Sequence, residues 1–313
     1  MFGYIVRRVL ATIPTMLVVA LAVFFLMRIG PGDPAALLAG DDASSVEIEQ
    51  IRAQLGLDRP MVVQFVDWMG NLLQGDMGNS VFNGTPVLEL ILQRVEPTVA
   101  VAVATIVFAI SLAIPLGILA AWKAGTWLDR AIMGFAVVSF SLPVFLIAYL
   151  FVFGFSLELR WLPVQGYRPI QEGFVPFIRH LILPSLALGL VYTALLARMT
   201  RSTMLEVLNE DYVRTARAKG VGIFWVLIAH ALQNAAIPIV TTIGVGIASL
   251  IGGVVVTESV FAIPGIGRLT IDAVLHRDYP VIQGVIILTA LAYVLINLVI
   301  DLSYTLLDPR IRY

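Results

Sequence analysis

Six long runs without an acidic residue, a basic residue or a histidine constrain the fold of this chain more than any other feature. A helix needs about 20 apolar residues to cross the hydrocarbon core of a bilayer. Backbone groups in lipid must be hydrogen-bonded within the protein, which favours helices. The sequence therefore predicts an all-α membrane protein with six transmembrane helices. The runs are Val9–Met27, Thr98–Ala121, Ala131–Leu157, Leu181–Ala197, Ala231–Thr257 and Tyr279–Ile300.

The composition agrees with lipid as part of the solvent. Hydrophobic residues make up 59% of the 313 residues and charged residues only 13%, whereas about a quarter of the residues in soluble domains are charged. The chain has no cysteine, which excludes disulfides and cysteine-based metal or redox sites.

The distribution of Lys and Arg predicts the orientation of the chain. With the N-terminus inside, cytoplasmic segments carry more than half of the 20 basic residues, as the positive-inside rule requires. Both termini are then cytoplasmic, residues 28–97 form an extracytoplasmic insertion, and residues 198–230 form a cytoplasmic loop. Helical periodicity is expected within the insertion at Ser45–Leu55 and Pro60–Leu73. No internal repeat or linker is evident, so residues 1–313 are interpreted as a single transmembrane domain.

Prolines and polar residues inside the runs each admit two interpretations. The prolines are either packing kinks or hinges that open a pathway; they are Pro115, Pro143, Pro184 and Pro238. Ser139, Ser141 and Asn297 either line a pathway or are buried packing partners, and Glu258 either lines a pathway or lies at the edge of the bundle near the membrane interface. These pathway candidates are Ser139, Ser141, Asn297 and Glu258.

The cytoplasmic loop contains a predicted short helix. Asn209 is expected to cap this helix, with Glu210 and Asp211 in its first turn, and Gly220 is expected to end it. Arg214 is placed to pair with either acidic residue. A second short element follows, led by Ile223, Phe224 and Trp225. Physical arguments leave two interpretations open: a helix that rests on lipid headgroups, or a helix that enters a groove on a cytoplasmic partner.

The same residues carry a resemblance. Glu210-Asp-Tyr-Val-Arg-Thr-Ala-Arg-Ala-Lys-Gly220, followed by His230-Ala-Leu-x-Asn-Ala-x-Ile-Pro238, resembles the cytoplasmic EAA loop of ABC importer permeases. It is similar in particular to the B-type permease subunit of the dipeptide/oligopeptide/nickel family. Other pieces similar to that subunit are Arg7-Arg8, Ile13-Pro14, Pro31-Gly-Asp-Pro34, Leu55-Gly-Leu-Asp58, Gly75-Asp-Met-Gly78, Pro264-Gly-Ile-Gly267, Arg277-Asp-Tyr-Pro280, Gln283-Gly284 and Asp308-Pro-Arg310.

The chain departs from the general EAA pattern in two places. Arg214 stands where the pattern has a small residue, as it does in peptide-type permeases. The gap from Gly220 to Pro238 is also longer, which leaves the limits of the coupling helix open.

The resemblance implies a type I ABC importer (MetI-like) permease fold in the bacterial inner membrane. It also implies four kinds of partner: a second homologous permease, two ATPase subunits or domains, an extracytoplasmic solute-binding protein, and membrane lipid. Di- and oligopeptides are the expected substrates, with nickel chelates, glutathione, opines or oligosaccharides as alternatives. The residues expected to couple the permease to the ATPases are Glu210, Asp211, Tyr212, Arg214, Ala216, Arg217, Gly220, Phe224 and His230.

No catalytic residue, metal ligand or cofactor site is expected in this chain, nor a nucleic-acid partner. A Walker A motif needs Gly-Lys-Ser/Thr, but the lysines are Lys123 and Lys219, preceded by Trp122 and Ala218. ATP and Mg²⁺ would therefore bind to the partner ATPases. An ATP-independent secondary transporter stays as the alternative, although that class usually carries ionisable residues in mid-membrane. An integral-membrane enzyme would need a catalytic cluster, which the sequence does not offer.

Overall fold

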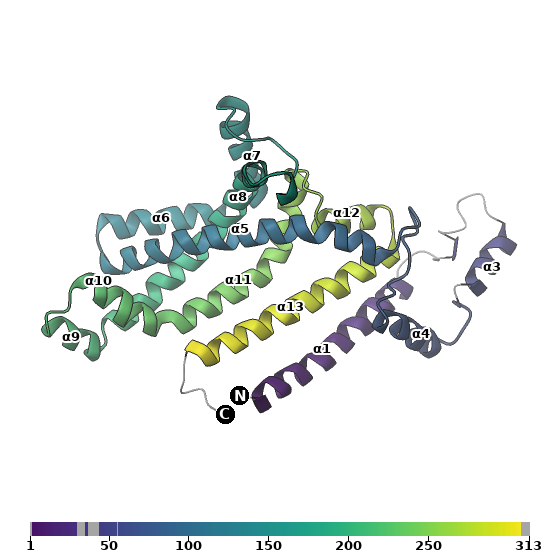
Figure 1. The fold of residues 1–313 in the computed structure, drawn as a ribbon, viewed down its shortest axis with the longest axis horizontal. Coiled ribbons are helices and arrows are strands. Elements are labelled where there is room, and N and C mark those ends of the chain that lie inside the picture. Colours follow the sequence, from purple (N-terminus) through teal and green to yellow (C-terminus); the bar gives the residue numbers. More distant parts are fainter. Residues whose placement is uncertain (1, 30–34, 37–43, 55, 308–313) are drawn as a thin grey trace. The chain divides into compact units, whose positions relative to one another are not determined.

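The computed structural model describes residues 2–29, 35–36, 44–54 and 56–307, and helices dominate these ranges. An isolated antiparallel bridge joins Asn79 and Pro86. The helices are α1 (Phe2–Ile29), α3 (Ser45–Gln54), α4 (Met61–Leu73), α5 (Val87–Trp122), α6 (Trp127–Ser141), α7 (Val144–Phe151), η1 (Val152–Glu158), η2 (Ile170–Glu172), α8 (Phe174–Leu208), α9 (Asp211–Ala218), α10 (Ile223–Trp225), η3 (Val226–Leu232), α11 (Gln233–Val260), α12 (Ile266–Leu275) and α13 (Tyr279–Leu307) (Figure 1).

Five helical segments within the described ranges are long and apolar enough to cross a membrane, and a bent pair of helices supplies a sixth span. The prediction of six spans is confirmed when this pair, α6 with α7 and η1, is counted as one. The continuous segments are Arg7–Phe25, Val87–Trp122, Phe174–Leu208, Ile223–Leu250 and Tyr279–Leu302.

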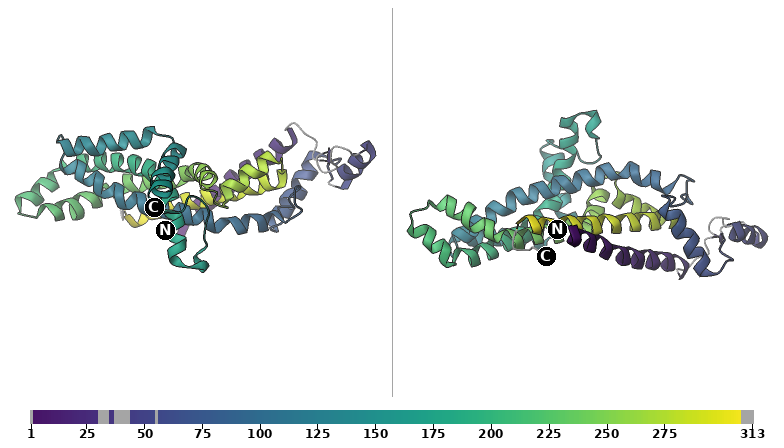
Figure 2. Two further views of the ribbon diagram at one scale, coloured as in Figure 1. Left: turned by 90° about the horizontal axis from the view of Figure 1, so that it is seen from above. Right: turned by 60° about the horizontal axis from the view of Figure 1, so that its bottom comes forward.

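The third predicted span, Ala131–Leu157, is not one straight helix. It breaks between α6 and α7 with a bend of 103°, and α7 turns away from α6 (Figures 1 and 2). Leu142 and Pro143 are both extended, with ψ of 133° and 139°. Pro143 cannot donate a backbone hydrogen bond and disfavours a helical residue before it. Pro115, Pro184 and Pro238, in contrast, lie inside the continuous helices α5, α8 and α11.

Both predicted helices of the insertion are present, as α3 and α4. The prediction of helical character at Ser45–Leu55 and Pro60–Leu73 is therefore confirmed for the described residues. Leu55 itself lies outside them.

The chain divides into two compact units, and the first comprises residues 1–5, 94–268 and 295–313. In this unit α8 packs against α6, α7 and α11. One core cluster joins α5, α8, η3 and α11 around Leu196, Met204 and Ala231. Small residues permit close crossings: a Cβ at Gly117 would lie 2.5 Å from the Cβ of Thr200, and the Tyr192 hydroxyl occupies the place of a Cβ at residue 246.

The second unit comprises residues 6–93 and 269–294. In it, α4 packs on α1 through Phe65 and Trp68, whose rings lie 5.2 and 5.6 Å from that of Phe24. Asp278 is buried and accepts hydrogen bonds from the Ser80 hydroxyl and the Val81 amide. These bonds attach the loop before α5 to the turn between α12 and α13.

Candidate coupling site

The predicted short helix of the cytoplasmic loop is α9, which two residues separate from the end of α8. The prediction that Asn209 caps it is wrong. Asn209 is the C-terminal cap of α8, with helical backbone angles, and its side-chain amide donates to the Leu205 carbonyl at 2.9 Å. Glu210, with an extended backbone, is the N-cap residue of α9, and Asp211 is its first residue. The carboxylate of Asp211 stands at the positive end of the helix dipole.

Gly220 closes the segment as predicted. Its φ of +78° is in the left-handed region, where glycine has no steric penalty. Its amide donates to the Arg217 carbonyl at 3.0 Å, and the Val221 amide donates to the Ala216 carbonyl at 3.2 Å. These bonds satisfy carbonyl groups at the end of α9 and turn the chain toward α10.

One face of α9 is buried against the rest of the chain, because α9 contacts η3 and the end of α8. Val213 is fully buried and Ala216 nearly so. Ala216, predicted as part of the coupling surface, therefore points inward and supports the helix. Glu210, Asp211, Tyr212, Arg214 and Arg217 are exposed. The helix is thus anchored on one side and free on the other.

Aromatic side chains continue this exposed surface on α10. Phe224 and Trp225 are 63% and 61% exposed, and their rings meet edge to face at 5.7 Å. Val226 and Leu227, directly after them, are buried and anchor the segment. Trp225 was outside the predicted coupling residues, although exposed Trp is a common anchor at protein interfaces. Figure 1 shows α9 and α10 together at one end of the first unit.

The charges on α9 are only weakly engaged within the chain. Arg214 Nη1 lies 3.4 Å from Asp211 Oδ1, and both side chains are more than two-thirds exposed. Such a pair contributes little to stability. Partial burial and the neighbouring Glu210 charge raise the pKa of Tyr212. We call the surface of Tyr212, Arg214, Arg217, Phe224 and Trp225 the coupling surface.

His230 lies apart from the coupling surface, in the π-helical segment η3. It is half-buried, and its backbone carbonyl accepts a hydrogen bond from the Asn234 amide at 2.7 Å. η3 runs without interruption from α10 into α11. Wide turns of this kind are often found at functional sites. His230 therefore belongs to the junction between the coupling surface and the membrane helix α11.

The candidate pathway residues lie on three different helices. Ser139 is buried on α6, whereas Ser141 is exposed and its hydroxyl donates to its own helix at Val137 O, at 2.8 Å. Asn297 is half-buried on α13. Glu258 is fully buried near the end of α11, where its carboxylate accepts bonds from the Thr98 hydroxyl at 2.5 Å and the Arg268 amide at 3.0 Å. The hydrogen bonds of Glu258 favour a structural role.

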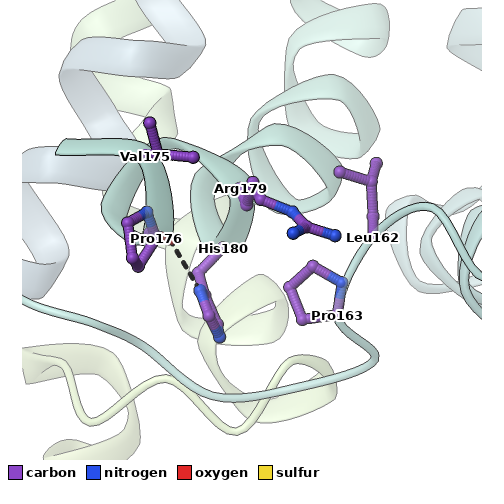
Figure 3. A pocket seen from close by; sticks show the side chains of 6 residues that line it. All are labelled: Leu162, Pro163, Val175, Pro176, Arg179 and His180. Carbon is purple, nitrogen blue, oxygen red and sulfur yellow. Dashed lines mark hydrogen bonds between the residues drawn. The ribbon is translucent and has the colours of Figure 1, made fainter. Parts of the chain in front are cut away.

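The opposite end of α8 carries a pocket of about 360 Å³. Arg179 and His180 line it (Figure 3). Arg179 donates to the Trp161 carbonyl at 2.7 Å, and a His180 ring nitrogen lies 2.7 Å from the Pro176 carbonyl. The remaining lining is apolar: Leu162, Pro163, Val175 and Pro176. The loop before α8 is fastened nearby, since Gly166 donates to the Phe261 carbonyl at 2.8 Å. None of the predicted coupling residues lies at this end.

Comparisons with known proteins cover the whole chain. Residues 113–313 match the family of the binding-protein-dependent transport system inner membrane component, and residues 1–113 match the corresponding N-terminal family. The chain is 51% identical to the "Probable peptide ABC transporter permease protein y4tP" of Sinorhizobium fredii, over 99% of both chains. It is 44% identical to the glutathione transport system permease protein GsiC of Escherichia coli K12, over 100% of both chains.

A solved structure agrees in fold. An inward-facing form of the MetNI methionine ABC transporter matches with a TM-score of 0.60, at 17% identity, over 71% of this chain and 97% of the other. This likeness shows a MetI-like fold. The helices, the sequence matches and the fold together show that the chain belongs to the family of binding-protein-dependent transport system inner membrane components, the multi-pass permease subunits of ABC importers.

Proposed function

We propose that this permease forms, with a second homologous permease, the pathway by which di- and oligopeptides enter the cell. A solute-binding protein delivers the peptide on the outer side, and two ATPase subunits or domains act on the inner side. The family supports binding-protein-dependent transport, and the names of the relatives support peptides, including glutathione.

The orientation in this proposal follows the positive-inside rule. Both termini, α9 and α10 are cytoplasmic, and α3, α4 and the pocket at the start of α8 are on the outer side. Arg214, Arg217 and Lys219 then lie on the inner face, where an ATPase dimer has access to them.

The observation that carries the proposal is the construction of the coupling surface. Val213 and Ala216 anchor α9 to the chain, while Tyr212, Phe224 and Trp225 are 42–63% exposed. Exposed aromatics next to arginines are the residue types that dominate protein–protein contacts. Docking of an ATPase onto this surface covers them.

Transport is then a change between two conformations. Closure of the ATPase dimer on ATP favours the outward-open permease because the coupling surface makes different contacts in the two states. This chain supplies no nucleotide site, since neither Lys123 nor Lys219 belongs to a Gly-Lys-Ser/Thr sequence. Hydrolysis takes place on the partners.

The test begins with the tagged chain, purified in mild detergent with its bound proteins. We expect mass spectrometry to identify a second permease and P-loop ATPases. The complex is then reconstituted into liposomes with the solute-binding protein, and uptake of a labelled dipeptide, tripeptide and glutathione is measured with and without ATP. ATP-dependent uptake of a peptide supports the proposal. Uptake by the chain alone, without ATP, would establish a secondary transporter instead.

A further inference from the structure

A partly buried ion pair joins α6 to α8 near the end of α8 that precedes α9. Arg201 Nε lies 2.6 Å from Asp129 Oδ1, and Arg201 Nη2 lies 2.8 Å from Asp129 Oδ2. The Asp129 side chain is 6% exposed and that of Arg201 28%. The Gly125 amide also donates to Asp129 Oδ2, at 2.9 Å. A planar, two-pronged pair of this kind fixes orientation as well as distance.

The position of the pair relates it to coupling. Arg201 lies on α8, seven residues before that helix ends at Leu208, and α9 starts at Asp211. Asp129 lies in the first turn of α6, where its charge complements the helix dipole. The neighbouring Thr200 meets α5 at Gly117, with room for no Cβ. The last turns of α8 are therefore held on two sides, by α5 through packing and by α6 through the ion pair.

We infer that Asp129 and Arg201 are positioning residues that transmit movement of the coupling surface to α6. This inference rests on the proposed function. When the ATPases displace α9, the attached end of α8 moves, and the fork of Arg201 carries the first turn of α6 with it. The other end of α6 is the break at Leu142–Pro143, with its 103° bend. α6 thus connects the last turns of α8, next to the coupling surface, with the break between α6 and α7.

The two prongs of the pair are important for this role. A single contact between a flexible ammonium and a carboxylate allows rotation of one helix against the other, whereas a guanidinium fork does not. Loss of the fork therefore lets α8 move without α6, and ATP is hydrolysed without a matching change in the pathway.

The experiment uses the complete importer in liposomes, with its solute-binding protein and a labelled dipeptide. Arg201→Lys keeps the charge and removes the fork; Arg130→Lys, at an exposed arginine next to Asp129, makes the same chemical change without breaking the pair. For each variant, assembled complex, ATP hydrolysis and uptake are measured. We expect Arg201→Lys and Asp129→Asn to hydrolyse ATP but to lower uptake per ATP about fivefold or more, the usual range of coupling between sites.

A reciprocal exchange separates transmission from folding. The double variant Asp129→Arg, Arg201→Asp exchanges the two charges of the pair. We expect it to restore part of the uptake per ATP that is lost when either of these two changes is made alone. We expect Arg130→Lys to behave as the wild type. Wild-type uptake per ATP in Arg201→Lys and Asp129→Asn would overturn the inference. So would a fall in hydrolysis and uptake that follows only the amount of assembled complex. Failure of the proposed function gives a different result, since the wild-type complex itself would then show no ATP-dependent uptake.

Discussion

The hydroxyl of Thr98 on α5 donates to the carboxylate of Glu258 on α11 at 2.5 Å. The same hydroxyl oxygen accepts the Ile266 amide at 2.8 Å, and the second carboxylate oxygen accepts the Arg268 amide at 3.0 Å. Both amides belong to the first turn of α12, where backbone donors lack partners within the helix. Glu258 and Thr98 therefore cap the first turn of α12, residues 266–268, from two other helices of the first unit.

Loss of this cap lowers stability. Glu258→Gln replaces a carboxylate, which only accepts hydrogen bonds, by a side-chain amide. One end of that amide is itself a donor and faces the Thr98 hydroxyl or the Arg268 amide, which are also donors. We expect the free energy of unfolding to fall by about 1–3 kcal/mol, the usual cost of a buried group left without its hydrogen bond. Thermal unfolding of the purified chain in detergent measures the change. Ser259→Ala is the control, because Ser259 is exposed and its hydroxyl donates to its own helix at Val255 O. Equal melting temperatures for the two variants would contradict the capping role.

The glycine next to the cap is required for steric reasons. A Cβ at Gly265 would lie 2.0 Å from Glu258 Oε1, whereas a Cβ at Gly252 meets nothing within 4 Å. We expect Gly265→Ala to destabilise the chain by about 1–3 kcal/mol through overpacking, and Gly252→Ala to be neutral or slightly stabilising, as Ala is in a helix. The same unfolding assay compares them. Unchanged stability of the Gly265→Ala chain would mean that the Glu258 carboxylate can adopt another position.

Local features of this chain were predictable, and contacts between distant residues were not. The helix α9 and its end at Gly220 follow from preferences within a dozen residues, although its N-cap is Glu210 and not the predicted Asn209. The inward direction of Ala216 does not, because it depends on where η3 packs. The 103° break at Pro143 could not be singled out from the sequence, since three other prolines in similar runs remain within continuous helices. Asp129 and Arg201 are 72 residues apart in the sequence. The sequence alone shows each of them only as a charged residue near a membrane edge and does not reveal that they pair.

The two arginines of α9 are expected to act on the partner and not on the fold. Arg214 and Arg217 are exposed, and the Arg214–Asp211 pair is worth less than about 1 kcal/mol. The double change Arg214→Ala, Arg217→Ala should leave the amount of membrane-inserted chain unchanged. It should reduce the ATPase recovered in a pull-down, most clearly at low salt, where charge attraction is least screened. Unchanged recovery of the ATPase at low salt would remove these arginines from the interface.

Two tryptophans of equal exposure give a matched test of the coupling surface. Trp225 on α10 and Trp161 near the opposite end of α8 are both 61% exposed. If Trp225 is an interface anchor, Trp225→Ala should weaken ATPase binding by about 2 kcal/mol or more, while Trp161→Ala leaves it unchanged. Titration of detergent-solubilised permease with the ATPase measures both. Equal affinities for the two variants would place the ATPase contact elsewhere.

Gly220 tests whether the turn after α9 transmits the movement of the ATPases. A Cβ here meets nothing within 4 Å inside the chain, but the φ of +78° strains most residues other than glycine, at roughly 1–2 kcal/mol. We expect Gly220→Leu to remain in the membrane and to uncouple ATP hydrolysis from uptake. Gly220→Asn tolerates the left-handed backbone and should retain more coupling. Gly222→Leu, at a φ of −58° and also in open space, is the control for bulk alone. If all three variants transport like the wild type, the turn has no role in coupling. If Gly220→Asn and Gly222→Leu lose as much coupling as Gly220→Leu, the cause is side-chain bulk against the ATPase and not backbone geometry.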